Sequence, residues 1–332
     1  MDDASLLVPK EYWPFHGGFL VKFVTLLSAT WLLVVLTTTG GCDTPRKHVS
    51  PSKSGENSEM INRVGLDAEN RANDEIHIRA RYCFRYTGTN EKQSEKGAYH
   101  AYTDWWVPLD QVALVCLDVW NMDLHQDMHV RDERITRERI VPLVKAARAS
   151  GLQIIHAPSP SIARRHANWV NLEQDAQRPE SSGNTPHWPP TSFRERTGEF
   201  SRYASPERPN ILSSWKFLGD NCDFHDQVRP ISDEPVIATG EELQRLCAQK
   251  GILFLLYAGF HTPGCMTNRS YGITEMRDRG YTCILVRDCT NGMETHETHD
   301  EQTSMKGTIA FLEHMQIYSL ESRQIIESFA KQ

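Results

Sequence analysis

From residue 112 to the end of the chain, short apolar runs alternate with segments whose apolar residues recur at helical spacing. Continuous apolar runs are typical of strands buried on both faces of a parallel sheet. They cover residues 112–119, 152–157, 252–258, 281–288 and 317–320. This alternation predicts an α/β fold: a doubly wound, mainly parallel sheet in a three-layer arrangement, with helices on both faces and ligands at the carboxyl ends of the strands.

Capping and turn residues mark the expected helices. Thr136 can cap a helix that ends at Gly151. Thr239 and Glu242 form a capping box for a helix that ends at Gly251. The remaining helices are expected at 266–279, at 303–315 and from Ser322 onward.

Two parts of the expected domain, residues 76–332, lack this regular pattern. Residues 76–106 are typical of edge strands or a hairpin added ahead of the sheet. Residues 158–235 are rich in Pro, Ser, Asn, Trp and Arg, and they are too long for an ordinary connection. We interpret this second stretch as an ordered insertion or a lid near the site.

The first 42 residues are typical of an export signal. An uncharged apolar run at 23–39 precedes two glycines and Cys42, which resembles a bacterial lipoprotein cleavage site with Cys42 lipidated. Thr39 and an acidic start depart from that pattern, so an uncleaved anchor or a buried helix remain alternatives. The polar residues 43–75 predict a disordered tether. We expect a cell-envelope protein, secreted across the inner membrane and held at the membrane surface by a lipid or a helix.

Composition narrows the possible partners. The net charge is −7, and Lys and Arg are scattered, so the chain has no basic patch for nucleic acid and a small-molecule ligand is favoured. The eight cysteines have irregular spacings without a CxxC pair, which favours neither a disulfide framework nor a zinc ribbon. We expect no cofactor, and a homo-oligomer is possible.

Polar residues follow several predicted strands and should meet at one rim of the sheet. They are Asp118, His156, the turn at 259–265 and Asp288. A cysteine at a helix N-terminus, such as Cys265, is expected to have a lowered pKa, and Asp118 could take its proton. Backbone N–H groups of the turn could bind an oxyanion. This pair is the candidate catalytic centre; a buried inert thiol and a carboxylate that only caps a backbone N–H are the alternatives.

Two motifs give a family resemblance. Gly259, Thr262 and Cys265 form a GxxTxxC motif, and residues 113–121 read ALVCLDVWN. The first is similar to the nucleophile turn of the isochorismatase-like cysteine hydrolases, which include nicotinamidases and other small amidases, and the second to that family's first strand, which ends in a catalytic Asp. The resemblance extends over about 110–157 and 239–320 and is nearest to an uncharacterised bacterial subgroup.

The resemblance implies a mechanism and a set of site residues. Asp118 would deprotonate Cys265, and the thiolate would attack an amide or related carbon–nitrogen bond of a small molecule to give a thioester that water hydrolyses. A cis peptide is implied at Phe260-His261, with an oxyanion hole made by the backbone N–H groups of His261 and Cys265. The substrate pocket is expected to include Trp120, His156, Phe260 and Arg269.

The family's catalytic Lys is not found, because residues 217–249 contain no lysine. Arg269, Arg229 or His261 could take its place beside the Asp118 carboxylate. The alternative function is therefore a catalytically impaired binding or scaffold protein that keeps the pocket without turnover.

Two further chemistries have weaker support. Metal binding is conceivable at two segments with His beside acidic residues, but we favour solvated loops for both and predict no metal. The residues are Asp123, His125, Asp127 and His129 in the first segment and His296 and His299 in the second. A redox-active thiol would need a resolving cysteine near Cys265, for which Cys289 and Cys116 are the candidates.

Overall fold

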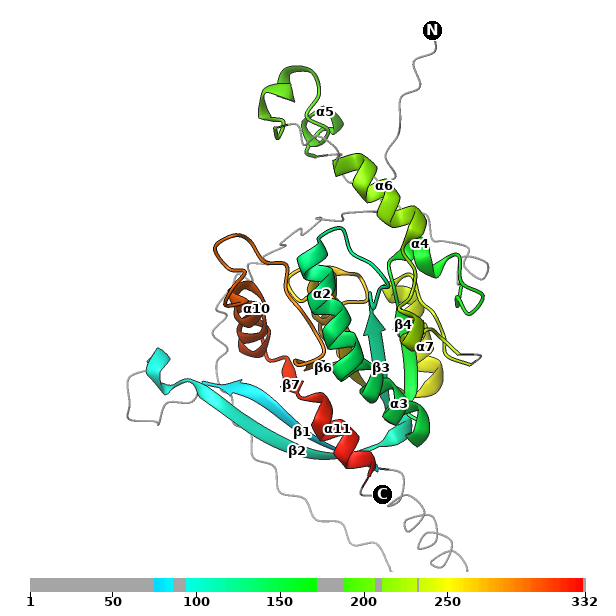
Figure 1. Cartoon of the computed structure of the whole chain (residues 1–332). Helices are drawn as coiled ribbons and strands as arrows, with labels where there is room; N and C mark the ends of the chain where they lie inside the picture. The colour runs from blue at the N-terminus through cyan, green and yellow to red at the C-terminus, as the bar shows by residue number, and fades with distance from the viewer. Residues whose placement is uncertain (1–74, 86–93, 172–187, 207–210, 232, 331–332) are drawn as a thin grey trace, which may run out of the picture. The chain divides into compact units, whose positions relative to one another are not determined.

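The computed structural model describes residues 75–85, 94–171, 188–206, 211–231 and 233–330. They form a seven-stranded sheet with the order β2-β1-β7-β6-β5-β3-β4. Figure 1 shows the β1–β2 hairpin and labels strands β3, β4, β6 and β7 of this sheet. Strands β3 to β7 pair in parallel, whereas β1 is antiparallel to both β2 and β7. The strands are β1 (Glu75–Phe84), β2 (Tyr99–Pro108), β3 (Val112–Leu117), β4 (Gln153–Ala157), β5 (Phe254–Gly259), β6 (Thr282–Val286) and β7 (Tyr318–Leu320). The predicted doubly wound, mainly parallel fold is confirmed.

Helices connect the parallel strands and complete the domain. The α-helices are α2 (Gln126–Ile135), α3 (Val141–Ser150), α4 (Pro160–Ala163), α5 (Thr191–Arg194), α6 (Ile211–Asn221), α7 (Gly240–Lys250), α8 (Cys265–Asn268), α9 (Ile273–Asp278), α10 (Thr303–His314) and α11 (Ser322–Phe329). Short 3₁₀ turns lie at Glu95–Gly97, Leu109–Gln111, Gly198–Tyr203 and Asp226–Val228. The predicted capping box of Thr239 and Glu242 is present at the start of α7.

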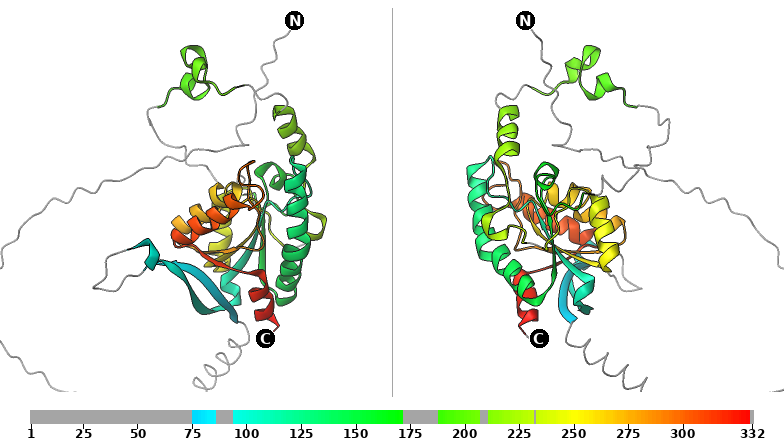
Figure 2. Two further views of the ribbon diagram at one scale, coloured as in Figure 1. Left: turned by 60° about the vertical axis from the view of Figure 1, so that its left-hand side comes forward. Right: turned by 90° about the vertical axis from the view of Figure 1, so that its right-hand side faces the viewer.

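Both faces of the sheet are covered by helices (Figure 2). Leu114 of β3 packs into a core with residues of α3 and α11, and its neighbour Val115 packs into a second core with residues of α7, α9 and α10. Successive strand residues point to opposite faces, so a strand that is covered twice needs apolar residues at every position. The continuous apolar runs of the sequence have this origin.

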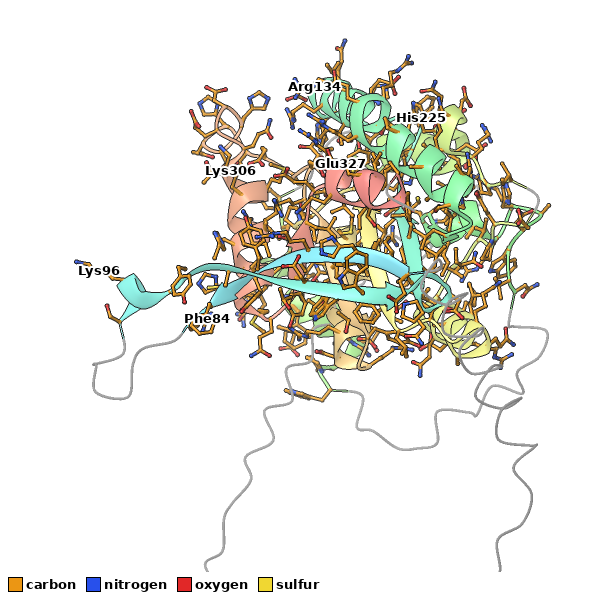
Figure 3. The ribbon with its side chains drawn as sticks, turned by 90° about the horizontal axis from the view of Figure 1, so that it is seen from below. Phe84, Lys96, Arg134, His225, Lys306 and Glu327 are labelled. Atoms are coloured by element: carbon orange, nitrogen blue, oxygen red, sulfur yellow. The ribbon has the colours of Figure 1, made fainter. Side chains whose placement is uncertain are left out.

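The predicted hairpin at 76–106 is the β1–β2 pair, and β2 forms one edge of the sheet. Phe84 and Lys96 lie at its free end, away from the centre of the domain (Figure 3). β1 joins the sheet through a single register pair with β7, Arg81 with Ser319. The hairpin therefore extends the sheet at the edge that lies away from β3 and β5.

The prediction that Thr136 caps a helix is wrong. α2, a π-helical turn at Thr136–Ile140 and α3 follow one another without a break, so Thr136 lies inside a long helical run. The buried residues of α2 are Met128 and Asp132, and one of them is charged. An amphipathic helix is recognised in a sequence by apolar residues at helical spacing. Since α2 buries only one apolar residue, its sequence could not be distinguished from that of a polar loop.

The proposed export segment and tether, residues 1–74, lie outside the described residues, as do residues 172–187, 207–210 and 232 of the predicted insertion. The described residues all belong to one compact unit of the chain. Within this described part, no helix combines the length and the apolar character that a membrane crossing requires. The described part of the insertion contains helices α4, α5 and α6.

Candidate active site

Asp118 lies immediately after β3, at the carboxyl end of the parallel strands. Its backbone adopts a left-handed conformation with φ of 49°, and its N–H donates to the carbonyl of Ala157 at 3.1 Å. The side chain is fully buried. The strand end therefore turns this carboxylate into the interior, as the position of a polar residue after an apolar run predicts.

The turn after β5 crosses very close to β3. Gly259 has φ of 130°, and a Cβ at this position would lie 1.8 Å from the carbonyl oxygen of Leu117. Only glycine fits such a close approach of two backbones. The peptide bond between Phe260 and His261 is cis, as predicted. The turn leads directly into α8, whose first residue is Cys265.

Two backbone N–H groups of this turn remain available. The N–H groups of Gly259, Phe260, Thr262 and Gly264 donate to the carbonyls of Cys289, Leu117, Asn291 and His261, respectively, at 2.8 to 3.0 Å. Within the described part of the chain, the N–H groups of His261 and Cys265 have no hydrogen-bond acceptor. These are the two groups that were predicted to form an oxyanion hole.

Asp118, Arg269 and Ser159 form one hydrogen-bonded cluster beside Cys265. The Cys265 thiol is close enough to Asp118 and Arg269 for each of them to shift its pKa. The Nη2 atom of Arg269 lies 3.4 Å from Asp118 Oδ2 and 2.8 Å from Ser159 Oγ. The Ser159 hydroxyl in turn donates to Asp118 Oδ1 at 3.2 Å. The structure thus brings the predicted pair together and adds a cation and a hydroxyl.

Burial is the largest influence on the pKa values of Asp118 and Cys265. It raises the pKa of Asp118, although Arg269 and the hydrogen bonds to the carboxylate oppose the shift. Burial and the neighbouring Asp118 raise the pKa of Cys265 to about 12. The expected lowering of this pKa by a helix N-terminus is wrong, because α8 has only four residues and burial outweighs its dipole. The free protein therefore holds a neutral Cys265 thiol beside the buried Asp118 carboxyl group.

Arg269 is the cation that contacts Asp118. Of the other two candidates, Arg229 pairs with acidic residues of the insertion, and His261 pairs with Asp132. Arg269 reaches Asp118 because the predicted helix at 266–279 is two helices: α8 ends at Asn268, and the backbone of Arg269 is extended, with φ of −63° and ψ of 153°. The single-helix prediction was wrong at the residue that faces the site.

The loop after Asp118 is paired with the end of the insertion. Trp120 and Phe224 form an isolated antiparallel bridge, and the N–H of Asn121 donates to the carbonyl of Asp223 at 3.0 Å. The Trp120 ring lies 6.4 Å from the His261 ring, measured between centroids, and its buried Nε1 has no partner among the described residues. Trp120 thus lies beside the nucleophile turn, and its place in a substrate pocket stays a prediction.

Two predicted pocket residues have other surroundings. Phe260 is 2% exposed and packs in the core on the α3 face of the sheet. His156 is 1% exposed, and its Nε2 lies 2.8 Å from the Glu234 carboxylate. Its ring contacts Phe224. The structure therefore does not place Phe260 or His156 against the Cys265 sulfur, and the pocket prediction needs correction at both positions.

Glu234 ties the end of the insertion to the sheet. Its carboxylate accepts hydrogen bonds from Arg148 Nε at 2.7 Å, from Arg148 Nη2 at 2.9 Å and from His156. Burial alone would raise the pKa of Glu234, but these bonds outweigh it and lower the pKa to about 2. Burial also lowers the pKa of His156. In the fold, the carboxylate is thus favoured as the ion and the imidazole as the neutral form.

These shifts predict acid sensitivity. Both groups bind fewer protons in the folded chain than in the unfolded one, so the free energy of unfolding falls as the pH drops below about 6.5 for His156 and from about 4.5 towards 2 for Glu234. The variant Glu234→Gln should lose about 3 kcal/mol of stability at pH 7, because the partly buried guanidinium of Arg148 then lacks the carboxylate that neutralises it. Urea unfolding at several pH values measures both effects. Equal stability of the variant and the parent at pH 7 would contradict this account.

Two aspartates and a histidine lie close together beside the nucleophile turn. Asp123, Asp132 and His261 each offer one ligand atom within 4.8 Å of the others. The sequence suggested two segments as metal sites. Of the first segment, only Asp123 belongs to this group. His299 of the second segment instead contacts the exposed Asp127 of the first, with His299 Nε2 3.1 Å from the carboxylate. Asp132 was not identified from the sequence, because a carboxylate within the charged stretch of α2 carries no distinguishing signal.

No protein-family model matches the chain, and no curated protein matches it in sequence. Solved structures do resemble it. A cysteine hydrolase from Pseudomonas syringae pv. phaseolicola 1448A has 13% identity and a TM-score of 0.44, and the match covers 68% of this chain and 96% of that one. Among the structural neighbours are isochorismatase-family hydrolases. An isochorismatase from Pseudomonas putida KT2440 has 16% identity and a TM-score of 0.39, with coverage of 65% and 91%.

A third structure of this kind is an N-carbamoylsarcosine amidase from Thermoplasma acidophilum. It has 13% identity and a TM-score of 0.35, and the match covers 64% of this chain and 96% of that one. At these identities and scores the likeness concerns the fold, and the assignment of chemistry depends on the residues of the site.

Proposed function

We propose that the chain is a cysteine-dependent hydrolase of a small-molecule amide or a related carbon–nitrogen bond. The observation that carries the proposal is the closeness of the Cys265 thiol to the buried Asp118 carboxylate, next to two backbone N–H groups without acceptors among the described residues. A nucleophile, a base and oxyanion donors within one turn are the components of acyl transfer.

The proposed reaction has two halves. Asp118 takes the thiol proton of Cys265 as the sulfur bonds to the carbonyl carbon, and the N–H groups of His261 and Cys265 donate to the oxyanion. The carbon–nitrogen bond then breaks, and the amine leaves with the proton from Asp118. Water, deprotonated by Asp118, attacks the thioester, the carbon–sulfur bond breaks, and the proton returns to sulfur.

Arg269 is the cation that would take the role of the family Lys, because it contacts the Asp118 carboxylate. Its guanidinium contacts Asp118 and Ser159 and opposes the rise in the pKa of Cys265, so it favours negative charge on either partner during the proton transfer. A binding or scaffold protein without turnover was the alternative because of the missing Lys. A cation that contacts the base supports the hydrolase over the scaffold.

Turnover by the full-length chain tests the proposal. The protein is incubated with a panel of small primary amides, N-carbamoyl compounds and ureas, and the release of ammonia or amine is measured. We expect turnover of at least one compound, and its loss after one equivalent of a thiol reagent has modified Cys265. Release that survives full modification of Cys265 would contradict the proposal, and absence of release from the whole panel would favour the scaffold.

Anchoring and assembly remain proposals as well. The sequence of residues 1–42 supports attachment to the cell envelope through a lipid on Cys42 or an apolar segment. One structural neighbour, from Escherichia coli, is an octameric hydrolase of unknown specificity. A homo-oligomer of this chain, which the sequence left open, is retained as a proposal.

A further inference from the structure

Three side chains from separate segments converge beside the nucleophile turn. His261 belongs to the turn, Asp132 to α2, and Asp123 to the loop that precedes α2. One ligand atom from each lies within 4.8 Å of the other two, and His261 Nε2 is 2.9 Å from Asp132 Oδ2. Metal–ligand bonds of 2.0 to 2.2 Å place the ligands of one ion about 3 to 4 Å apart. A single ion can therefore reach all three side chains with small rotations.

The group has an excess of negative charge in a largely buried place. Asp132 is 7% exposed and His261 is 4% exposed, whereas Asp123 is partly exposed. In the described part of the chain, neither Asp123 nor Asp132 has an ion pair with Lys or Arg. Two carboxylates this close need a compensating positive charge, since an unpaired buried charge is strongly unfavourable. A single imidazole could supply at most one positive charge.

The remaining polar contacts orient the proposed ligands. Asn291 Nδ2 donates to Asp132 Oδ1 at 2.7 Å, which leaves Oδ2 directed at His261. The N–H of His125 donates to Asp123 Oδ1 at 2.9 Å, which leaves the second oxygen of that carboxylate free of this bond. Outer hydrogen bonds of this kind fix the ligands of protein metal sites.

We propose that Asp123, Asp132 and His261 bind one divalent first-row transition ion, with Zn²⁺ as the representative. One imidazole nitrogen and two carboxylate oxygens suit a borderline ion of this class, and three protein ligands leave a coordination position open. The proposal departs from the expectation of no metal. It does not depend on the hydrolase function, because it rests on charge and on the placement of the ligands.

Cobalt binding tests the site. The full-length chain is treated with a chelator, desalted and titrated with Co²⁺, and visible absorption and tryptophan fluorescence are recorded. We expect one equivalent of Co²⁺ to bind and to be displaced by Zn²⁺. Fluorescence should be quenched, because the Trp120 ring lies 6.4 Å from the His261 ring. The variant Trp120→Phe should lose most of this quenching and keep the absorption band.

Matched variants locate the ion. Asp123→Asn keeps the shape of the side chain and its acceptor for the His125 N–H, and it should weaken Co²⁺ binding about 10-fold or more. Asp127→Asn removes a carboxylate that is 64% exposed and pairs with His299, and it should leave binding unchanged. Absence of saturable Co²⁺ and Zn²⁺ binding, or binding that Asp123→Asn does not weaken, would overturn the proposal. Since the readout is binding, a failure of the hydrolase function would leave this result intact.

Discussion

Replacement of Cys265 by alanine is expected to lower kcat for amide hydrolysis by about 10⁴-fold or more, which corresponds to at least about 5.5 kcal/mol of the barrier. The loss should be this large because the sulfur forms the covalent bond to the acyl group, and no other group of the described site can replace it. The residual rate would come from binding and from the two N–H groups at His261 and Cys265. Initial rates with the best substrate of the amide panel measure the effect.

Cys83→Ala is the matched control for this variant. Cys83 lies on β1, where its sulfur is 3.7 Å from His314 Nε2, and it is partly buried like Cys265. It contacts no residue of the proposed site, so its replacement should leave kcat within about twofold, with the overall structure checked by circular dichroism. A Cys265→Ala protein that keeps a tenth of the parent's kcat would contradict a covalent role for this sulfur.

Replacement of Asp118 by asparagine is expected to lower kcat by about 10³- to 10⁴-fold with little change in KM. Asparagine has almost the same shape, but it cannot accept the thiol proton of Cys265. The variant should also melt at a lower temperature, because the buried guanidinium of Arg269 loses its carboxylate. A variant that keeps kcat within tenfold of the parent would show that Asp118 is not the base.

The pH profile separates this base from a structural carboxylate. Burial raises the pKa of Asp118 above its usual value, and a base acts only when it is deprotonated. In the parent, kcat/KM should therefore rise with pH through this pKa and be lost below it. In Asp118→Asn the residual rate should lack this acidic limb, whereas a purely structural carboxylate would leave the limb in place.

Much of the fold follows from the apolar pattern, because β3, β4, β5 and β6 are covered on both faces and need apolar residues at nearly every position. The pattern was insufficient where polar residues are buried. In α2, Asp132 faces inward to His261 and Asn291, so the helix lacks an apolar face that the sequence could show. The break between α8 and α9 was also missed, because nothing local at Arg269 excludes a continued helix.

The candidate site likewise contains residues that the sequence could predict and residues that it could not. Asp118 and Cys265 could be predicted because each follows a recognisable strand, and parallel strands end at one edge of the sheet. Ser159 follows β4 and was available to the same reasoning, although no role was assigned to it. Asp132 and Asn291 come from a helix and a loop whose positions depend on tertiary packing. The contacts of Asp132 with both Asn291 and His261 depend on the folded chain and have no counterpart in local sequence.

The central claim, that Cys265 is the nucleophile, is tested most directly by intact mass after reaction with a panel of electrophilic amides and nitriles. A nitrile that enters the site should take up the thiol across its carbon–nitrogen triple bond and give one covalent adduct per chain, located at Cys265 by peptide mapping. Cys265→Ala should remain unmodified, and Asp118→Asn should react far more slowly. The account would be contradicted if no adduct formed at Cys265 while other cysteines of the chain were modified.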